Sequence, residues 1–397
     1  MTAQPIALNP TPPATGVRTE LVLSVVAVLL LGLSPLASFA LCAFLLINLP
    51  AHTPREARWI LGLATAIALA IMAGSRPLDP DDPSADIFVY HEIYSELAAG
   101  DLYWLTHFGG GLELTLPLLM WVWSWLLPPL SVNGLMFCLA LTASLSMWLW
   151  AETRPGSAQG STTPALVGIC LVLLNIYFAT QLARQFLSLI VLLFAFGAAT
   201  RPRRWLFLAL ASSLHLTALP FYALWLLARR GWLGWLAILG AMLVLRLYFV
   251  PLLAALDIVP QAVADKLQYY VDQEDASADA DIGSLRMVVV LGLLSLVSLL
   301  ACRLRPDPAT RPWLVLPWMT GAVHFMLLPI PLASLRTTLI VHSVATGFIV
   351  WQMFAHRARG LLPVVLNVLL LYKVAAFAAG EGGAYLRPTP LMLSSFF

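Results

Sequence analysis

The chain has 397 residues, of which 60% are hydrophobic and only 11% are charged, and its mean hydropathy is +0.86. A soluble domain carries about 25% charged residues, so this composition excludes a soluble globular enzyme, and it also excludes disorder, collagen and a disulfide scaffold. The formal net charge of +2 provides no basic surface for nucleic acid. The class that remains is an all-α polytopic membrane protein, whose spans each need about 20 apolar residues.

Runs of apolar residues follow one another along the chain and predict about 11–13 transmembrane helices. The first run, 21–49, is too long for one upright helix, and Ser34-Pro35 is expected to split it into two. The run 205–228 is expected to break at His215 and Pro220. We predict an N-terminal tail at 1–20, a single transmembrane domain at 21–379 and a C-terminal tail at 380–397. The runs are 21–49, 58–75, 112–130, 133–151, 164–181, 186–200, 205–228, 232–252, 284–303, 311–330, 336–356 and 361–379.

The four cysteines lie far apart inside apolar runs, without a CxxC pair or a histidine at ligand spacing. This pattern is typical of small core residues and not of a zinc or redox site, so we expect neither a metal nor a cofactor. The cysteines are Cys42, Cys138, Cys170 and Cys302. The start of the chain lacks a basic region before the first apolar run, and we expect the first helix itself to direct membrane insertion.

Arginines predict the orientation, because cytoplasmic loops are enriched in basic residues. The clusters expected on the cytoplasmic side are Arg55/Arg58, Arg201/Arg203/Arg204, Arg229/Arg230, Arg303/Arg305/Arg311 and Arg357/Arg359. Two acidic loops, at about 76–111 and 253–283, then lie on the outer side. With this alternation the run 112–130 begins and ends on one side. It is therefore either a re-entrant half-helix, broken at Pro117 and Pro128-Pro129, or a misassigned span; a broken segment would line a site.

Several arginines depart from this rule because they fall on the acidic, outer side, among them Arg76, Arg246 and Arg387. Three others fall at the outer ends of separate helices: Arg184, Arg286 and Arg336. Cations are costly at membrane depth, and the alternative roles are pairing with outer aspartates or snorkelling to headgroups. Guanidinium groups are suited to phosphate oxygens, which they hold in a bidentate manner. If the three converge, they form a site for a lipid-linked diphosphate.

A proton acceptor is the second requirement of a transfer site. His215 lies between two apolar halves, where a polar residue is a functional candidate and imidazole can take a proton. His324 and His342 also lie in apolar runs and are alternative bases, and each of the three could instead be a hydrogen-bonded core histidine. Among the acidic residues, Glu113 and Asp86 are the candidates to deprotonate or orient a sugar hydroxyl.

Aromatic and glycine patterns add less information. Tyr269-Tyr270, in the second outer loop, is the best candidate platform for a sugar ring, although aromatic residues also form the interfacial belt of membrane proteins. Gly109-Gly110-Gly111 is read as a flexible turn before the run 112–130, not as a dinucleotide loop. The motifs GxxxxGK[ST], GxSxG and HExxH are absent from the sequence.

The order of these features resembles the EpsG-like branch of the Wzy-type polysaccharide polymerases over about residues 86–340. The most specific element is an Arg-Gln pair followed, about 30 residues later and after a basic turn, by a histidine among small residues. The matching segments are Asp86-x-x-x-Tyr90, Glu113-x-x-x-Pro117, Leu182-Ala-Arg184-Gln185-Phe-Leu-Ser188, Ala211-Ser-Ser-Leu-His215-Leu-Thr-Ala218, Tyr269-Tyr270 and Ser334-Leu-Arg336. The first outer loop departs from the pattern because it is rich in proline and aspartate.

The resemblance implies a GT-C-like glycosyltransferase in the bacterial inner membrane, with its active site facing the periplasm and no metal requirement. Donor and acceptor would be oligosaccharide repeat units linked to undecaprenyl diphosphate, and a flippase and a chain-length regulator are possible partners. Arg184, Arg286, Arg336 and Gln185 would hold the diphosphate. His215 or Glu113 would take the acceptor proton, and Asp86 is a further catalytic candidate. Tyr90, Tyr269 and Tyr270 would contact sugar.

Three other classes use similar features. A lipid-diphosphate-dependent ligase or another outer-leaflet glycosyltransferase would employ the same arginines with a different acceptor. A polysaccharide transporter or flippase often contains inverted repeats, and this sequence has no evident symmetry. A membrane O-acyltransferase would need a catalytic histidine at a membrane face, and the setting of His215 fits the polymerase pattern better.

Overall fold

The computed structural model describes residues 15–51, 53–76, 78, 86–153, 164–230, 232–255, 289–290, 293, 296, 311–326, 336–355 and 361–379. Within these ranges the chain is helical and contains no strand. The helices, in chain order, are α1 (Thr15–Leu29), η1 (Leu30–Gly32), α2 (Pro35–Asn48), α3 (Arg55–Gly74), α4 (Asp86–Ala98), α5 (Tyr103–His107), η2 (Phe108–Gly111), α6 (Thr115–Leu126), α7 (Val132–Thr153), α8 (Pro164–Val172), α9 (Tyr177–Gln181), α10 (Ala183–Gly197), α11 (Arg201–Leu214), α12 (Ala218–Ala228), α13 (Trp232–Ala255), α16 (Arg311–Met326), η4 (Ile340–Val344), α18 (Thr346–Ala355) and α19 (Leu362–Ala379).

The predicted split of the first apolar run is confirmed. The first helical segment ends at Gly32, and α2 begins at Pro35. Ser34 caps α2, because its side chain accepts a hydrogen bond from the amide of Ala37 at 3.2 Å. Proline at the first helical position needs no amide partner, so Ser34-Pro35 both ends one helix and starts the next.

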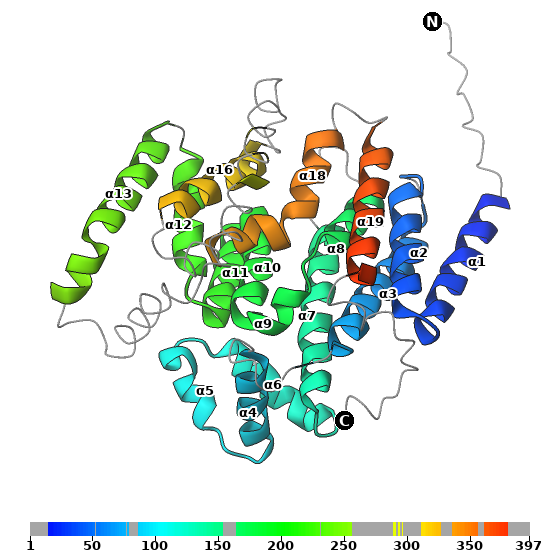
Figure 1. Ribbon diagram of the computed structural model, residues 1–397, viewed down its shortest axis with the longest axis horizontal. Helices are drawn as coiled ribbons and strands as arrows, with labels where there is room; N and C mark the ends of the chain where they lie inside the picture. Colours follow the sequence, from blue (N-terminus) through cyan, green and yellow to red (C-terminus); the bar gives the residue numbers. More distant parts are fainter. Residues whose placement is uncertain are drawn as a thin grey trace, which may run out of the picture.

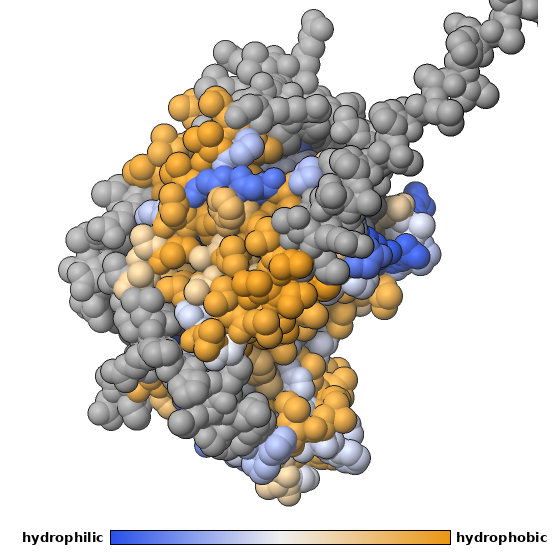
Figure 2. All heavy atoms as spheres, turned by 90° about the vertical axis from the view of Figure 1, so that its right-hand side faces the viewer, coloured by the Kyte–Doolittle hydropathy of each residue, from blue (hydrophilic) through white to orange (hydrophobic). Residues whose placement is uncertain are grey.

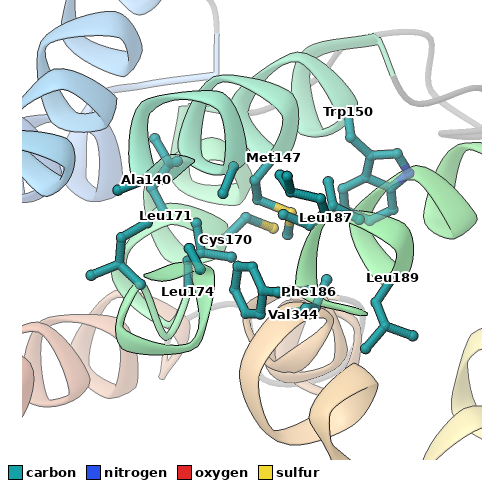
Figure 3. Close-up of a cluster of buried hydrophobic side chains, with 14 of the residues drawn as sticks. Ala140, Met147, Trp150, Cys170, Leu171, Leu174, Phe186, Leu187, Leu189 and Val344 are labelled. Atoms are coloured by element: carbon teal, nitrogen blue, oxygen red, sulfur yellow. The ribbon is translucent and has the colours of Figure 1, made fainter. Parts of the chain in front are cut away.

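The core lies where α7, α8, α10 and η4 meet (Figure 1). Apolar side chains from all four elements interdigitate there, among them Met147, Cys170, Phe186 and Val344 (Figure 3). Around this centre, α3 packs along α2 and α7, and α10 packs along α11. The described cysteines Cys42, Cys138 and Cys170 are buried thiols that form no disulfide, as expected for core residues.

The outer surface is apolar over wide areas. Large hydrophobic residues are exposed on α1 and on α19, for example Leu29 and Leu371, and Figure 2 shows a predominantly hydrophobic face on this side of the molecule. Such a surface suits lipid tails and would be unstable in water. Within the described ranges, α3 and α7 are long and apolar enough to cross a membrane, and the bent segment 336–354 adds a third if it counts as one span.

Two proline breaks that we expected are not found. Pro117 lies in the first turn of α6 and Pro220 in the first turn of α12, and both helices continue beyond them. The amides of a first helical turn have no intrahelical acceptor, so proline is tolerated there. The expected breaks at His215 and at Pro128-Pro129 are present, since α11 ends at Leu214 and α6 ends at Leu126.

Two runs read as single spans are interrupted. The run 164–181 is divided into α8 and α9, because the Asn175 amide donates to the Ser343 carbonyl at 3.0 Å instead of continuing the helix. The run 336–356 bends by 52° between its two halves, next to the π-helical turn η4. At this bend Gly347 packs against α8, where an added Cβ would lie 2.4 Å from the Ile169 carbonyl oxygen.

Candidate functional site

A tight glycine turn places Glu113 between η2 and α6. Gly109, Gly110 and Gly111 have φ angles of 57°, 73° and 79°, a left-handed region that favours glycine. The Glu113 side chain lies directly over Gly109, where an added Cβ would be 2.6 Å from the Glu113 Cγ. The three glycines are therefore a shaped support for a carboxylate and not simply a flexible turn.

The Glu113 carboxylate joins two other segments of the chain. Its Oε2 accepts a hydrogen bond from Nη1 of Arg184 at 2.7 Å, and its Oε1 bonds to Nδ1 of His215. The amide of Leu216 also donates to Oε1, at 3.4 Å. Only 5% of the Glu113 side chain is exposed. A carboxylate at this depth is stable only when its charge is paired and its oxygens are hydrogen-bonded, and both conditions are met here.

Interrupted helices present the two partners. Arg184 is in the first turn of α10, just after the break at Leu182, and His215 occupies the break between α11 and α12. Because α10 and α11 form a hairpin, both residues lie at its open end, away from the basic turn at Arg201. Ser188 stabilises the interruption between α11 and α12, because its hydroxyl donates to the carbonyls of Ala211 and His215 at 2.8 and 3.4 Å.

Two residues from the preceding segment surround Arg184. Tyr90, on α4, hydrogen-bonds with the guanidinium, and the Phe108 ring lies 4.9 Å from its central carbon. Asp86 begins α4, one turn before Tyr90, and its charge acts on the Tyr90 phenol. Burial raises the pKa of Tyr90, so the phenol is protonated at neutral pH.

Gln185 connects this site to the helix that begins near Arg336. Its Nε2 donates to the backbone carbonyl of Arg336 at 2.9 Å, although 151 positions separate the two residues. Arg336 therefore lies next to the Arg184-Gln185 pair. Three distant parts of the chain, which carry Glu113, Arg184 and Arg336, thus meet at one end of the helical bundle.

The electrostatics of the site determine which atom donates in the hydrogen bond between Glu113 and His215. Burial alone would raise the pKa of Glu113, but His215 and Arg184 outweigh this effect and hold the pKa of Glu113 below its ordinary value. An ionised carboxylate only accepts hydrogen bonds, so the Nδ1 atom of His215 is the donor. The second ring nitrogen, Nε2, takes no part in this bond, and Glu113 orients the imidazole through Nδ1.

Among the predicted residues that the structure describes, these lie together: Asp86, Tyr90, Glu113, Arg184, Gln185 and His215, with the backbone of Arg336 next to Gln185. Arg286, Tyr269 and Tyr270 lie outside the described residues. Of the alternative bases, His342 bonds with Ser343 in η4 and His324 is buried in α16, so it is His215 that bonds to Glu113.

Sequence reasoning overlooked the residues that support the site. Thr115 and Ser213 share a hydrogen bond of 2.6 Å that ties α6 to α11, and Phe108 covers Arg184. These are common residue types at unremarkable positions, and only the excess of glycine at 109–111 gave a signal. In the described ranges, no three His, Cys, Asp or Glu side chains cluster as metal ligands would.

The fold and the site define a helical membrane protein with a buried carboxylate, guanidinium and imidazole at one end of the bundle. Comparison with protein-family models matches the EpsG family over residues 59–378, so the chain belongs to the EpsG family. It is a polysaccharide-polymerase-like membrane protein of a class associated with glycosyltransferase-like polymerases and lipid-linked substrates. No curated protein and no solved structure gave a significant match.

Proposed function

We propose that this protein is a polysaccharide polymerase that joins repeat units linked to undecaprenyl diphosphate, on the periplasmic side of the bacterial inner membrane. The single observation that carries the proposal is the buried Glu113 carboxylate, which pairs with both Arg184 and His215 in a largely apolar bundle. A GT-C-like architecture of about 11–13 transmembrane helices, working with a flippase and a chain-length regulator, completes the proposal.

The reaction is glycosyl transfer. A hydroxyl group at the non-reducing end of one unit attacks the anomeric carbon of the other, and the bond from that carbon to the diphosphate oxygen breaks. The hydroxyl proton passes to Nε2 of His215, and the bonding electrons leave with the lipid diphosphate. Because negative charge grows on the diphosphate, a cation placed there stabilises the transition state more than the ground state.

The named residues divide these tasks. Glu113 holds the imidazole through Nδ1, as a buried carboxylate does in a catalytic triad. Arg184 and Arg336, with Arg286, neutralise the departing diphosphate, and Gln185 positions the Arg336 segment. Tyr90 is only 3% exposed, so it is proposed to position Arg184 and not to contact sugar as the sequence suggested. Tyr269 and Tyr270 are the proposed sugar contacts. Asp86 acts on Tyr90 and has a positioning role. This chemistry uses no metal or other cofactor.

Reconstitution with a lipid-linked repeat unit tests the proposal. The purified protein in liposomes should convert the unit into a ladder of products that differ by one repeat. A single transfer product, without a ladder, would indicate a ligase. Movement of the unit across the bilayer without a new glycosidic bond would indicate a transporter or flippase. Either result would contradict the proposal that the protein is a polymerase.

A further inference from the structure

A second group of buried nitrogen donors lies beside the site and is not used by the mechanism above. Arg76 follows the end of α3, and its guanidinium carbon lies 4.3 Å from the centre of the Tyr177 ring on α9. Gln181 ends α9, one helical turn after Tyr177 and therefore on the same face. The short helix α9 packs against α7 and α10 (Figure 1).

Both donors are buried without a hydrogen-bond partner. Nη1 of Arg76 and Nε2 of Gln181 are inaccessible to solvent and bond to no acceptor in the described part of the chain. The Gln181 residue is only 6% exposed. Buried donors are normally satisfied, because an unpaired one loses its hydration without compensation. One such donor on α9 and another that lies over Tyr177 of the same helix therefore indicate a missing acceptor.

The positive charge of Arg76 indicates that the missing acceptor is an anion. No carboxylate among the described residues forms an ion pair with Arg76, and Tyr177 supplies only its ring face. The backbone is fixed, since Asn133 donates to the carbonyls of Gly74 and Arg76 at 2.7 and 3.2 Å. A rigidly held guanidinium next to an amide donor matches an anion with several oxygens, and phosphate fits this description.

Arg76 and Gln181 lie close to the site formed by Glu113, Arg184 and His215. Gln181 precedes Arg184 by three residues, across the break at Leu182, so the pair and Glu113 lie at the same end of the bundle. Polymerisation uses two lipid-linked units at once, and each carries a diphosphate. We infer that Arg76 and Gln181, with Tyr177 orienting the guanidinium, form a second anion subsite, which holds the diphosphate of the acceptor unit while Arg184 and Arg336 hold that of the donor. This inference rests on the proposed function.

A binding count tests the inference with the full-length protein. The protein in phosphatidylcholine nanodiscs is titrated with farnesyl diphosphate, and the number of molecules bound is measured by calorimetry. The native protein should bind two. Arg76→Gln and Gln181→Leu should each weaken one site by roughly tenfold or more and leave the other unchanged. Arg76→Lys keeps the charge but not the planar fork, and should weaken the same site less than Arg76→Gln does.

The chain offers a matched control at the other end of α3. Arg55 also lies over an aromatic ring, that of Trp59 at 4.4 Å, so Arg55→Gln removes a similar cation–π contact and should leave two sites. Gln181→Leu removes a buried unpaired donor, so its melting temperature should not fall. Unchanged binding of two molecules by both Arg76→Gln and Gln181→Leu would overturn the inference.

Two further outcomes separate the alternatives. If the native protein binds one molecule and Arg184→Gln abolishes that binding, the inference of a second subsite is wrong while the proposed function stands. If the native protein binds no molecule, the inference and the proposed function are both wrong.

The titration is repeated in phosphatidylglycerol nanodiscs to identify the source of the phosphate. Loss of the Arg76-dependent site in those nanodiscs would assign it to a bilayer headgroup and overturn the substrate assignment, whereas its retention supports it.

Discussion

Glu113 and Arg184 form a hydrogen-bonded ion pair of 2.7 Å across 71 positions of sequence, and the Glu113 side chain is almost fully buried. Glu113 lies just before α6 and Arg184 lies in the first turn of α10. Both helices are shorter than the hydrocarbon core of a bilayer, so the pair forms where two partial helices meet. The pair fixes a positive charge and orients His215 at the same point.

Removing both members of this pair should destabilise the protein by less than the sum of the two single changes. Arg184→Gln deprives a buried carboxylate of a charged partner and should cost about 2 kcal/mol. Glu113→Gln should cost a similar amount, and the double variant should cost less than the sum of the two. Thermal unfolding in detergent measures all three. Strictly additive losses would show that the two side chains do not interact.

The stabilisation that Glu113 provides should depend on pH in a defined direction. Its pKa is below the ordinary value of 4.5 in the folded protein, so its contribution is complete above that pH and is lost as the pH falls through the folded pKa. The native protein should therefore lose its stability advantage over Glu113→Gln in acid. Melting temperatures measured from neutral pH down to about 3 test this, and a constant difference would contradict it.

A methyl group at Gly109 should displace Glu113. Gly109→Ala introduces a Cβ about 2.6 Å from the Glu113 Cγ, and it also strains a backbone with φ of 57°. Gly110→Ala is the control, because its φ is 73° but nothing lies within 4 Å of the added Cβ. Both should lose roughly 1–2 kcal/mol from backbone strain, but only Gly109→Ala should lose polymerisation as well. Equal activity in the two variants would show that the carboxylate is not held by this turn.

The helix break at His215 should depend on Ser188. Ser188→Ala removes the hydroxyl that donates to Ala211 and His215 and should cost about 1 kcal/mol, with a partial loss of activity. Ser212→Ala is a suitable control, because the Ser212 hydroxyl only bonds to Leu208 in its own helix. Indistinguishable activity in Ser188→Ala and Ser212→Ala would contradict this role.

The sequence predicted the polar members of the site because they interrupt an apolar pattern. Arg184, His215 and Glu113 are costly in such a setting, and each therefore stands out. Two of their supports, Phe108 and Thr115, do not stand out, because hydroxyl and aromatic residues are common in membrane helices. The contacts themselves arise from packing between segments that are distant in sequence, and a single sequence carries no information on those distances.

The same distinction explains the helix boundaries. The helix boundary at Ser34-Pro35 could be predicted because a capping residue and a proline act on the adjacent backbone. Pro117 and Pro220 were misread, because their effect depends on whether proline lies in the first turn or further along. The break at Asn175 was not predictable, since its cause is the distant Ser343 carbonyl. Helix boundaries that depend on neighbouring residues can therefore be predicted from the sequence, whereas boundaries that depend on tertiary contacts cannot.

The most direct test of the account measures substrate binding and turnover on the same reconstituted samples. We expect Arg184→Gln to lose binding of the lipid-linked repeat unit at the donor position, because the cation that holds the donor diphosphate is gone. His215→Asn should keep that binding but lose turnover by about 100-fold or more, because no group remains to take the proton. If His215→Asn forms the product ladder at the native rate, the assignment of the site is wrong.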